Sequence, residues 1–225
     1  LLSTGEIKKA LLLVGDAKKR IEATHDPLFG HAGTATAIEY MEDAPGFKFH
    51  FGTDGSGYDA IIIPDGGARN QVSLKSFDTT EIEGKMMNRL QTRMKGMDVF
   101  SFGITTAPKS IKKLGDHYGF NYQDADYFVF HQANMKMNNM IIKKLKLDIE
   151  KVPSCMYHFG NTSSASIPLT IVSQLKGKFE DHPTKFICCG FGVGLSWGTV
   201  AFETENMIVS DIVEVEENTG WKDEL

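Results

Sequence analysis

The sequence contains few cysteines and no long hydrophobic run. Three cysteines in 225 residues, two of them adjacent, do not make a disulfide framework, so we expect a reducing cytoplasm. No apolar stretch approaches the length of a membrane span, and no signal-peptide pattern is present. The formal net charge of -5 gives no general attraction to nucleic acid or to anionic membrane. We therefore expect a cytoplasmic globular protein with neither nucleic acid nor membrane as a partner.

The two ends of the sequence carry signals of their own. The chain starts at Leu1 without Met, within a pattern that indicates the end of a helix, so we expect that an N-terminal portion is missing. Residues 222–225 spell an endoplasmic reticulum retention signal, which has meaning only in a secreted eukaryotic protein. Because there is neither disulfide usage nor a leader, we interpret this spelling as a chance match.

Apolar runs alternate with helical patterns along the chain, which predicts an α/β fold with a largely central sheet. Strands are predicted at residues 10–15, 34–40, 99–105, 127–130, near 151–158, at 186–189 and at 198–203, with 206–215 extending the last one. The first of these is fully apolar, which is typical of a strand covered on both faces. Helices are predicted up to residue 9, partly over 80–95, over 108–118 with Pro in the first turn, after residue 131, and over 164–176. Residues 44–77, rich in Gly, Pro and Asp, are interpreted as a surface excursion that caps a site.

Between residues 124 and 147 a strand pattern changes into a helix pattern. The apolar run 127–130 stops at His131. An amphipathic helical pattern follows, with its apolar residues predicted on one side: Met137, Met140, Ile141, Leu145 and Leu147. Four lysines lie largely on another side: Lys136, Lys143, Lys144 and Lys146. In open α/β sheets ligands bind where strands end and helices begin, so His131 is predicted to lie at a binding edge.

Three loops are predicted to meet at this edge. They are residues 131–134, residues 160–166 after the strand expected to end near Tyr157, and residues 190–197 after the strand at 186–189. His131 Nε2–H and the Asn161 side-chain NH2 are donors, and two donors aimed at one point bind an oxyanion such as the enolate oxygen of a thioester. Each loop alone also has an ordinary structural explanation, such as a helix cap or a turn. The glycine loop does not match the dinucleotide fingerprint and is followed by a strand, which argues against nicotinamide binding.

Together, the three loops resemble one family. FHQAN (130–134), GNTSSASIP (160–168) and GFGVGLSWG (190–198) resemble the C-terminal signatures of β-ketoacyl-acyl-carrier-protein synthase III, a member of the thiolase superfamily. GMDVFSF (96–102) is similar to the segment that opens the second half of that family. Elongating ketoacyl synthases have a second histidine where this chain has Asn161, and thiolases have a second reactive cysteine, so both fit less well.

The resemblance implies a layered αβαβα fold made of two similar halves. Residues 1–95 would be the C-terminal portion of the first half, including an excursion at about 41–95. Residues 96–204 would form the complete second half, and 205–225 a strand extension with an acidic tail. The implied reaction is a decarboxylating Claisen condensation of acyl-CoA with malonyl-acyl-carrier protein in fatty acid synthesis, catalysed by a homodimeric acyltransferase. It needs no cofactor beyond the CoA thioester substrate, and no metal.

The resemblance also implies roles for individual residues. His131 and Asn161 match the pair that stabilises the enolate, so both must be neutral donors. Asn134 matches a residue near the CoA arm, and Phe191 the aromatic residue beside the nucleophile. Gly192 and the backbone N–H of Val193 match the loop of the acyl oxyanion hole. Lys136 matches a basic residue that contacts the acidic carrier protein; the other lysines of its helix form either a docking patch or a solvated face.

The nucleophilic cysteine of the family has no match in this sequence. The family residue would lie upstream of Leu1, and the bland interpretation of Cys155, Cys188 and Cys189 is that all three are buried, inert thiols. The chain as given is therefore expected not to form the acyl-enzyme. Two alternatives stay open: a specialised condensing enzyme that uses another acyl-CoA primer, and a non-catalytic thiolase-fold dimer partner.

Overall fold

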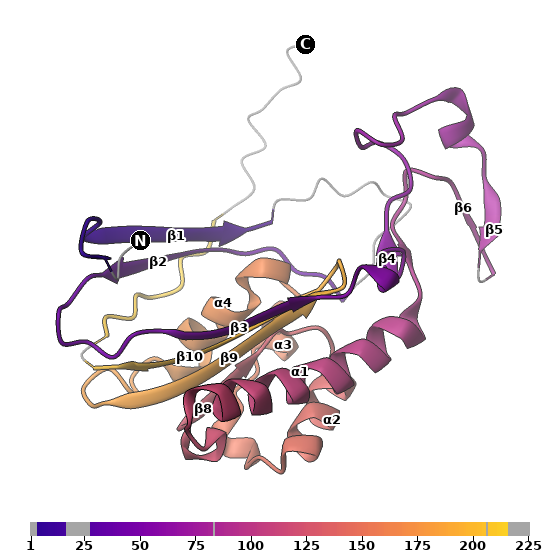
Figure 1. Cartoon of the computed structure of the whole chain (residues 1–225). Helices are drawn as coiled ribbons and strands as arrows, with labels where there is room; N and C mark the ends of the chain where they lie inside the picture. The colour runs from indigo at the N-terminus through magenta and orange to yellow at the C-terminus, as the bar shows by residue number, and fades with distance from the viewer. Residues whose placement is uncertain (1–3, 17–27, 83, 206, 216–225) are drawn as a thin grey trace.

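The computed structural model describes residues 4–16, 28–82, 84–205 and 207–215 (Figure 1). Two predictions fall outside these residues: the start of the helix at Leu2, and the tail after Glu216 with its last four residues. Within the described part of the chain, no helix is both long and apolar enough to cross a membrane.

A four-stranded mixed sheet forms the centre of the molecule. Its order is β3 (Lys48–Thr53), β10 (Ser196–Thr204), β9 (Thr184–Gly192) and β8 (Tyr127–Phe130). β8 and β9 are parallel, and the other two pairs are antiparallel. A second, antiparallel pair consists of β1 (Lys9–Gly15) and β2 (Gly33–Glu39). Two minor pairs lie in the segment before the first long helix: β4 (Ile61–Ile62) with β7 (Arg93–Met94), and β5 (Thr80–Ile82) with β6 (Lys85–Met87).

In the described part of the chain, four α-helices accompany these strands. They are α1 (Gly96–Tyr118), α2 (Met135–Leu145), α3 (Met156–Phe159) and α4 (Ser166–Thr170), the last continuing as a π-helical turn over Ile171–Leu175. Short 3-10 turns lie at Gly55–Gly57, Leu74–Phe77, Tyr122–Asp124, Ile149–Lys151 and Ser163–Ala165. The predictions of a strand at 127–130 and a helix after residue 131 are confirmed, as are the strands at 34–40, 186–189 and 198–203 and the helix near 164–176.

The elements stack in layers (Figure 1): the β1–β2 pair, then α4, then the four-stranded sheet, then α1 and α2. Alternate side chains of β8 point to opposite faces of the sheet and so pack into two different hydrophobic clusters. Phe128 and Phe130 belong to the core that α1 and α2 cover, whereas Val129 packs with Ile171 and Leu175 on the other face. A strand covered on both faces has no polar side, and for this reason the run at 127–130 is continuously apolar. The described residues thus form four layers of the expected αβαβα arrangement.

The predicted strand at 99–105 is wrong, because these residues lie inside the 23-residue helix α1. Their large apolar side chains pack around the core below α1, and the small Gly103 lets α1 approach α2: a Cβ there would lie 2.4 Å from Met137 Sδ. Pro108 sits in the middle of α1 instead of in a first turn. Proline has no N–H to donate, which disfavours this position locally, so burial of the surrounding face must outweigh that cost.

Other element predictions also need correction. The strand near 151–158 is a 3-10 turn followed by α3, and the partial helix over 80–95 is the β5–β6 hairpin with β7. The excursion does not include residues 48–53, which form β3 and pair with β10. Residues 5–8 are not helical, and β10 ends at Thr204, with no strand over the described residues 207–215 of the predicted extension. For β3, the partner strand β10 is distant in sequence, so local composition was a poor guide there.

The strand at 10–15 is confirmed as β1, but its predicted burial is wrong. Leu11, Leu12 and Leu13 are 61%, 52% and 67% exposed. Within the described residues β1 pairs only with β2, and no helix of this part covers its outer face. Met140 was likewise predicted to lie on the buried side of α2, and it is exposed, whereas Met137, Ile141 and Leu145 are buried as expected.

Candidate active site

His131 lies directly after β8, and its backbone is held from two sides. Its N–H donates to the Cys189 carbonyl at 2.9 Å, which continues the β8–β9 pairing by one residue. Its carbonyl accepts a hydrogen bond of 3.2 Å from Asn138 Nδ2. Asn138 is buried on α2 and was missed by the sequence analysis, although a polar residue on the apolar side of an amphipathic helix was a usable signal. Helix α2 therefore helps to fix the backbone position from which the His131 side chain extends.

The imidazole ring of His131 has two close neighbours. Its Nδ1 lies 2.8 Å from Ser166 Oγ, at the start of α4. The Phe191 ring meets it edge to face, with centroids 5.6 Å apart. Burial lowers the pKa of His131 from 6.5 to about 4, and a backbone hydrogen bond with Ser163 only partly opposes this shift. The ring is therefore neutral at physiological pH.

Asn161 reaches the site by a route different from the predicted one. No strand precedes it; instead Asn161 pairs with Phe29 in an isolated parallel β-bridge. Its N–H donates to the Leu28 carbonyl at 2.8 Å, and its carbonyl accepts the Gly30 N–H at 3.0 Å. Gly160 permits this contact, because its φ is +63° and a Cβ there would lie 2.5 Å from the Leu28 oxygen.

The side-chain amide of Asn161 has a defined orientation. Its Oδ1 accepts the backbone N–H of Ser163 at 2.9 Å, which leaves the Nδ2–H2 group as the free donor. Ser163 adopts φ = 53°, a left-handed conformation that is uncommon for a residue with a side chain. Because Ser163 contacts Asn161 and Ser166 contacts the ring of His131, the loop 160–166 links the two predicted donors.

The third predicted segment supplies Phe191, with a corrected boundary. The loop predicted to start at Gly190 is wrong, because β9 continues through Gly192 and pairs with β10. Phe191 is buried within this strand, while Val193 is exposed in the tight turn that follows. The three segments therefore meet around the His131 ring, one of them as a strand.

Asn134 and Lys136 lie at the start of α2. Asn134 is the N-cap residue, and its Oδ1 accepts the Met137 N–H at 2.9 Å. This bond explains the residue structurally and leaves its NH2 group for another contact. Lys136 is exposed one residue into the helix. The position of α2 thus directs Lys136 toward solvent while its buried side supports His131.

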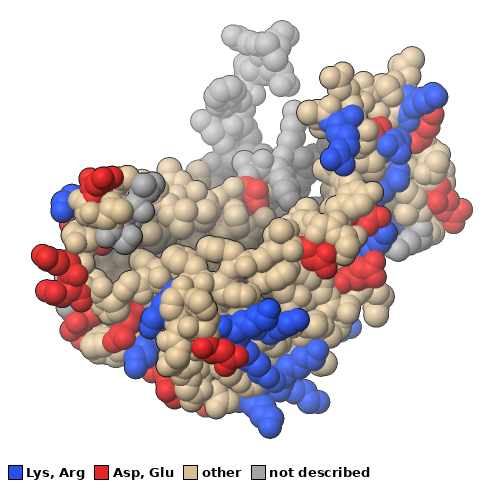
Figure 2. All heavy atoms as spheres, viewed as in Figure 1, with Lys and Arg blue, Asp and Glu red and all other residues tan. Residues whose placement is uncertain are grey.

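Lysines gather on the outer face formed by α1 and α2 (Figure 2). A hollow of about 490 Å³ there is lined by Thr105, Pro108, Lys109, Lys112, Lys113, Asp116 and Lys144. None of these lysines, nor Lys136, forms an ion pair with another described residue. His131 does not line this hollow, so the basic face is separate from the candidate active site.

All three cysteines are buried and unpaired with one another, as predicted. Burial raises the pKa of Cys188 and of Cys189 to about 12. Burial also raises the pKa of Cys155, whose Sγ accepts a hydrogen bond of 3.1 Å from Thr170. None of these thiols is poised to act as a nucleophile. Among the described residues, no group of three or more His, Cys, Asp or Glu side chains is placed to hold a metal ion.

Comparisons with known proteins point to one kind of relative. Residues 116–204 match the family described as 3-oxoacyl-[acyl-carrier-protein (ACP)] synthase III C terminal. The chain is 31% identical to β-ketoacyl-[acyl-carrier-protein] synthase III of Clostridium acetobutylicum over 206 residues, which cover 90% of this chain and 61% of that protein. It is also 31% identical to β-ketoacyl-[acyl-carrier-protein] synthase III 2 of Bacillus subtilis, covering 88% and 59% of the two chains.

A solved structure gives the same result for the fold. The crystal structure of a 3-oxoacyl-(acyl-carrier protein) synthase from Burkholderia xenovorans LB400 superposes with a TM-score of 0.80 and 35% identity, covering 93% of this chain and 60% of that one. The chain therefore spans about six tenths of the length of the relatives it matches. By sequence and by fold, the chain is similar to β-ketoacyl-[acyl-carrier-protein] synthase III, and its residues 116–204 match the C-terminal region of that family.

Proposed function

We propose that the chain carries the malonyl-decarboxylating half of the active site of a β-ketoacyl-[acyl-carrier-protein] synthase III-type condensing enzyme that acts in fatty acid synthesis. The observation that carries the proposal is the loop 160–166, which links the neutral ring of His131 to the amide of Asn161. Both side chains then present N–H groups instead of charges. Such a pair suits an oxygen on which negative charge develops.

In the proposed step, the bond between the carboxylate carbon and the α-carbon of a malonyl thioester breaks. CO2 leaves, and the electron pair of that bond forms an enolate whose negative charge lies on the thioester oxygen. The N–H groups of His131 and Asn161 donate to this oxygen. Because a neutral imidazole is a poor acid, it stabilises the enolate without protonating the α-carbon, which stays free to attack an acyl thioester.

The other site residues take supporting roles in the proposal. Phe191 forms an apolar wall against the His131 ring, and Asn134 offers its side-chain NH2 to the CoA arm of an acyl-CoA. Gly192 and the backbone N–H of Val193 belong to the acyl oxyanion hole. Val193 lies in an exposed turn, which is compatible with a donor that faces a substrate.

We propose the basic face of α1 and α2 as the place where malonyl-acyl-carrier protein docks. Lys136 begins this face, and the unpaired lysines of the neighbouring hollow extend it across α1. Because these ammonium groups are unpaired, they can attract an acidic partner without first breaking an ion pair. The proposed enzyme is a homodimer, as the resemblance implies, and lies in the reducing cytoplasm that the few cysteines indicate. It takes the CoA thioester as a substrate without a further cofactor.

The cysteines limit the proposal. With raised pKa values and full burial, none of the three can take an acyl group from CoA at a useful rate. The residues of this chain therefore support decarboxylation and enolate stabilisation, and the acyl-cysteine step is not assigned to them. A condensing enzyme with another acyl-CoA primer and a non-catalytic thiolase-fold dimer partner remain the alternatives.

Release of CO2 from malonyl-acyl-carrier protein by the full-length protein tests the proposal. Replacing His131 or Asn161 by Ala should lower the rate by about 100-fold, the usual loss for one oxyanion donor. The exposed His158 and Asn139, replaced by Ala, serve as matched controls and should leave the rate unchanged. An unchanged rate in His131→Ala and Asn161→Ala would remove both residues from the site.

Mass spectrometry distinguishes the alternatives. The full-length protein is incubated with acetyl-CoA and with branched and longer acyl-CoA primers, and acylated peptides are mapped. Acylation by one primer class identifies the substrate, and the absence of an adduct with every primer favours the non-catalytic partner. An adduct on Cys155, Cys188 or Cys189 would contradict the conclusion that these thiols are inert.

A further inference from the structure

We infer that Ser166 is a positioning residue that selects the tautomer of His131, so that the ring carries its single proton on Nε2. Ser166 is the first residue of α4 and is 1% exposed. Its Oγ lies 2.8 Å from His131 Nδ1 and accepts the backbone N–H of Gln132 at 3.3 Å. The hydroxyl therefore contacts the Nδ1 edge of the ring and leaves Nε2 for the proposed substrate.

The hydrogen atoms of these groups can be counted. A serine hydroxyl has one hydrogen to donate and two lone pairs that accept. The Gln132 N–H occupies one lone pair, and among the described residues the only acceptor within reach of the hydroxyl hydrogen is His131 Nδ1. If Nδ1 carried the proton instead, both lone pairs would be used and the buried hydroxyl hydrogen would have no partner. Leaving a buried donor unsatisfied is costly, so Ser166 donates to Nδ1 and the proton of the neutral ring lies on Nε2.

The backbone around Ser166 is itself held in place. Its N–H donates to the Ser163 carbonyl, and its carbonyl accepts a hydrogen bond of 2.7 Å from the Thr170 hydroxyl. Gln132, which donates to Oγ, is anchored by bonds of 2.7 Å to the Phe130 carbonyl and to the Ser154 hydroxyl. The hydroxyl therefore has little freedom to turn away from the ring.

The two proposed donors are thus oriented by different means. Asn161 is oriented by a backbone N–H, that of Ser163, which no side-chain substitution removes. His131 is oriented by a side-chain hydroxyl, which a single substitution removes. The value of the Nε2–H tautomer for the reaction rests on the proposed function, whereas the tautomer itself does not depend on it.

Nitrogen-15 NMR of the histidine side chains tests the inference, because protonated and unprotonated imidazole nitrogens have well-separated chemical shifts. The seven histidines are labelled, and His131 is assigned by the signal lost in a His131→Gln variant. The unsubstituted protein at pH 7 should show His131 with Nε2 protonated and Nδ1 unprotonated. A protonated Nδ1 in the unsubstituted protein would overturn the inference without any variant.

Two substitutions and a control complete the test. Ser166→Ala should change the ratio of the two tautomers by roughly tenfold, the size of one net hydrogen bond, and Ser166→Thr should restore the original ratio. Ser164→Ala, which removes an exposed hydroxyl of the same loop, should change nothing. Unchanged signals of the other six histidines show that the fold is kept, and an unaltered His131 tautomer in Ser166→Ala would then reject the inference.

Kinetics separate this inference from the proposed function. If both hold, Ser166→Ala lowers kcat for malonyl decarboxylation by roughly tenfold with the change in tautomer, and Ser166→Thr recovers it. If the unsubstituted protein shows the Nε2–H tautomer but releases no CO2, the proposed function fails and the role of Ser166 stands. If Ser166→Ala loses activity with its tautomer unchanged, the proposed function survives and the inference is rejected.

Discussion

The loop 160–166 and the excursion over residues 54–95 are both rich in turns, yet their hydrogen bonds have different consequences. In the loop, hydrogen bonds orient single side chains, His131 and Asn161, against a buried core. In the excursion, a polar cluster joins segments of backbone while large apolar side chains stay exposed. In this protein, the turn-rich segment that orients site side chains is therefore the one that packs against the hydrophobic core.

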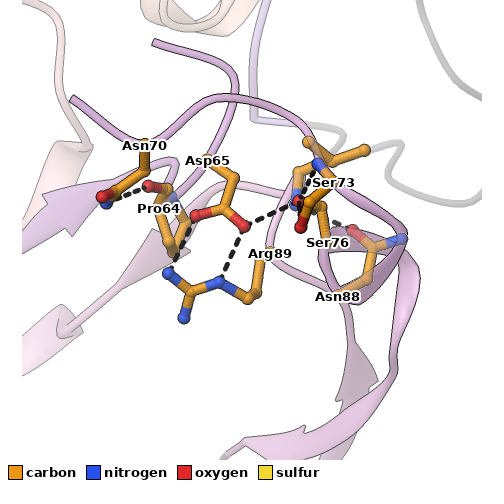
Figure 3. Close-up of polar contacts among 8 residues, drawn as sticks. Pro64, Asp65, Asn70, Ser73, Ser76, Asn88 and Arg89 are labelled. Carbon is orange, nitrogen blue, oxygen red and sulfur yellow. Dashed lines mark hydrogen bonds and ion pairs between the residues drawn. The ribbon is translucent and has the colours of Figure 1, made fainter. Parts of the chain in front are cut away.

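The polar cluster of the excursion is centred on Asp65 (Figure 3). Arg89 donates from Nε and Nη2 to the two carboxylate oxygens, each at 2.8 Å, and Ser76 Oγ donates to Oδ2 at 2.8 Å. The Arg89 guanidinium, followed by the Ser76 hydroxyl, lowers the pKa of Asp65. Backbone bonds connect the same three residues, from Asp65 N to the Arg89 carbonyl and from Arg89 N to the Ser76 carbonyl. The cluster thus ties residues 64–77 to the strand region near residue 89.

The side chains around this cluster are not packed into a core. Several apolar residues of the excursion are more than half exposed: Tyr58, Ile63, Val72, Leu74, Phe77 and Met86. In Figure 1 the excursion projects from the layered body beyond the start of α1. Its interpretation as a cap on a site stays a prediction, and the four experiments below compare its behaviour with that of the site.

The largest difference is expected for apolar truncation. Ile141 is fully buried on α2 beneath His131, so Ile141→Ala should lower the free energy of unfolding by about 2–5 kcal/mol. Leu74 is 90% exposed, and Leu74→Ala should change it by less than about 0.5 kcal/mol. Urea unfolding followed by circular dichroism measures both. Equal losses would mean that the excursion is packed against the body in solution.

As the pH falls, the contribution of His131 to stability should be lost at a higher pH than that of Asp65 in the excursion. The folded pKa of His131, about 4, lies below its unfolded value of 6.5, so the unfolded chain binds more protons between these pH values. The stability that the neutral ring contributes is complete above pH 6.5 and is lost as the pH falls toward 4, by up to about 3 kcal/mol. For Asp65 the lowered pKa means that its contribution is present above the unfolded value of 3.8 and is lost only below it.

Two measurements check this order. The unfolding free energy is determined from pH 7 to 4 for the unsubstituted protein and for His131→Gln, in which the decline between 6.5 and 4 should be shallower. Amide signals of residues near Asp65 are followed over the same range and should stay unchanged, because the stability that Asp65 contributes is lost only below pH 3.8. A decline of equal slope in both proteins would show that His131 is not the group responsible.

A moderate effect is expected at the helix that supports the site. Asn134→Ala removes the N-cap bond to Met137 and should destabilise the protein by about 1 kcal/mol, less than the loss in Ile141→Ala. Asn134→Ser retains a capping oxygen and should recover most of this loss. Urea unfolding gives the totals, and hydrogen exchange of the Met137 amide locates the change. No change in that amide would show that the cap bond is not formed in solution.

The smallest effect on the site is expected from the excursion cluster. Asp65→Asn removes the charge that binds Arg89 in a bidentate manner, so the amide protons of residues 65 and 89 should exchange roughly tenfold faster. The tautomer and pKa of His131 should stay unchanged, because among the described residues no hydrogen bond joins the cluster to His131. Asp59→Asn, which breaks an exposed ion pair with Lys95, is the matched control. A shift of the His131 pKa in Asp65→Asn would show that the excursion covers the site.

Local sequence patterns were sufficient to predict the elements whose apolar residues match the faces that are buried in the fold. The strand ending at His131, the helix after it and the strand at 186–189 were predicted because burial on both faces, or on one side of a helix, leaves a direct periodic signal. The motifs FHQAN, GNTSSASIP and GFGVGLSWG lie in or next to predicted elements, so His131, Asn161 and Phe191 could be proposed as neighbours from the sequence alone. Their meeting around one ring follows from the order of β8, β9 and α4.

Tertiary packing decided what these patterns left ambiguous. The alternation at 99–105 fits a strand or a helix, and only burial against the sheet makes it part of α1. The pairing of β3 with β10 and the bridge between Phe29 and Asn161 join residues more than 130 positions apart, so no local window contains them. The bond between His131 and Ser166 spans 35 residues and exists because α4 packs beneath β8. Interactions between residues close in sequence determine which helices and strands form, whereas hydrogen bonds between these elements depend on how they pack. At His131, we infer that this packing determines which ring nitrogen carries the proton.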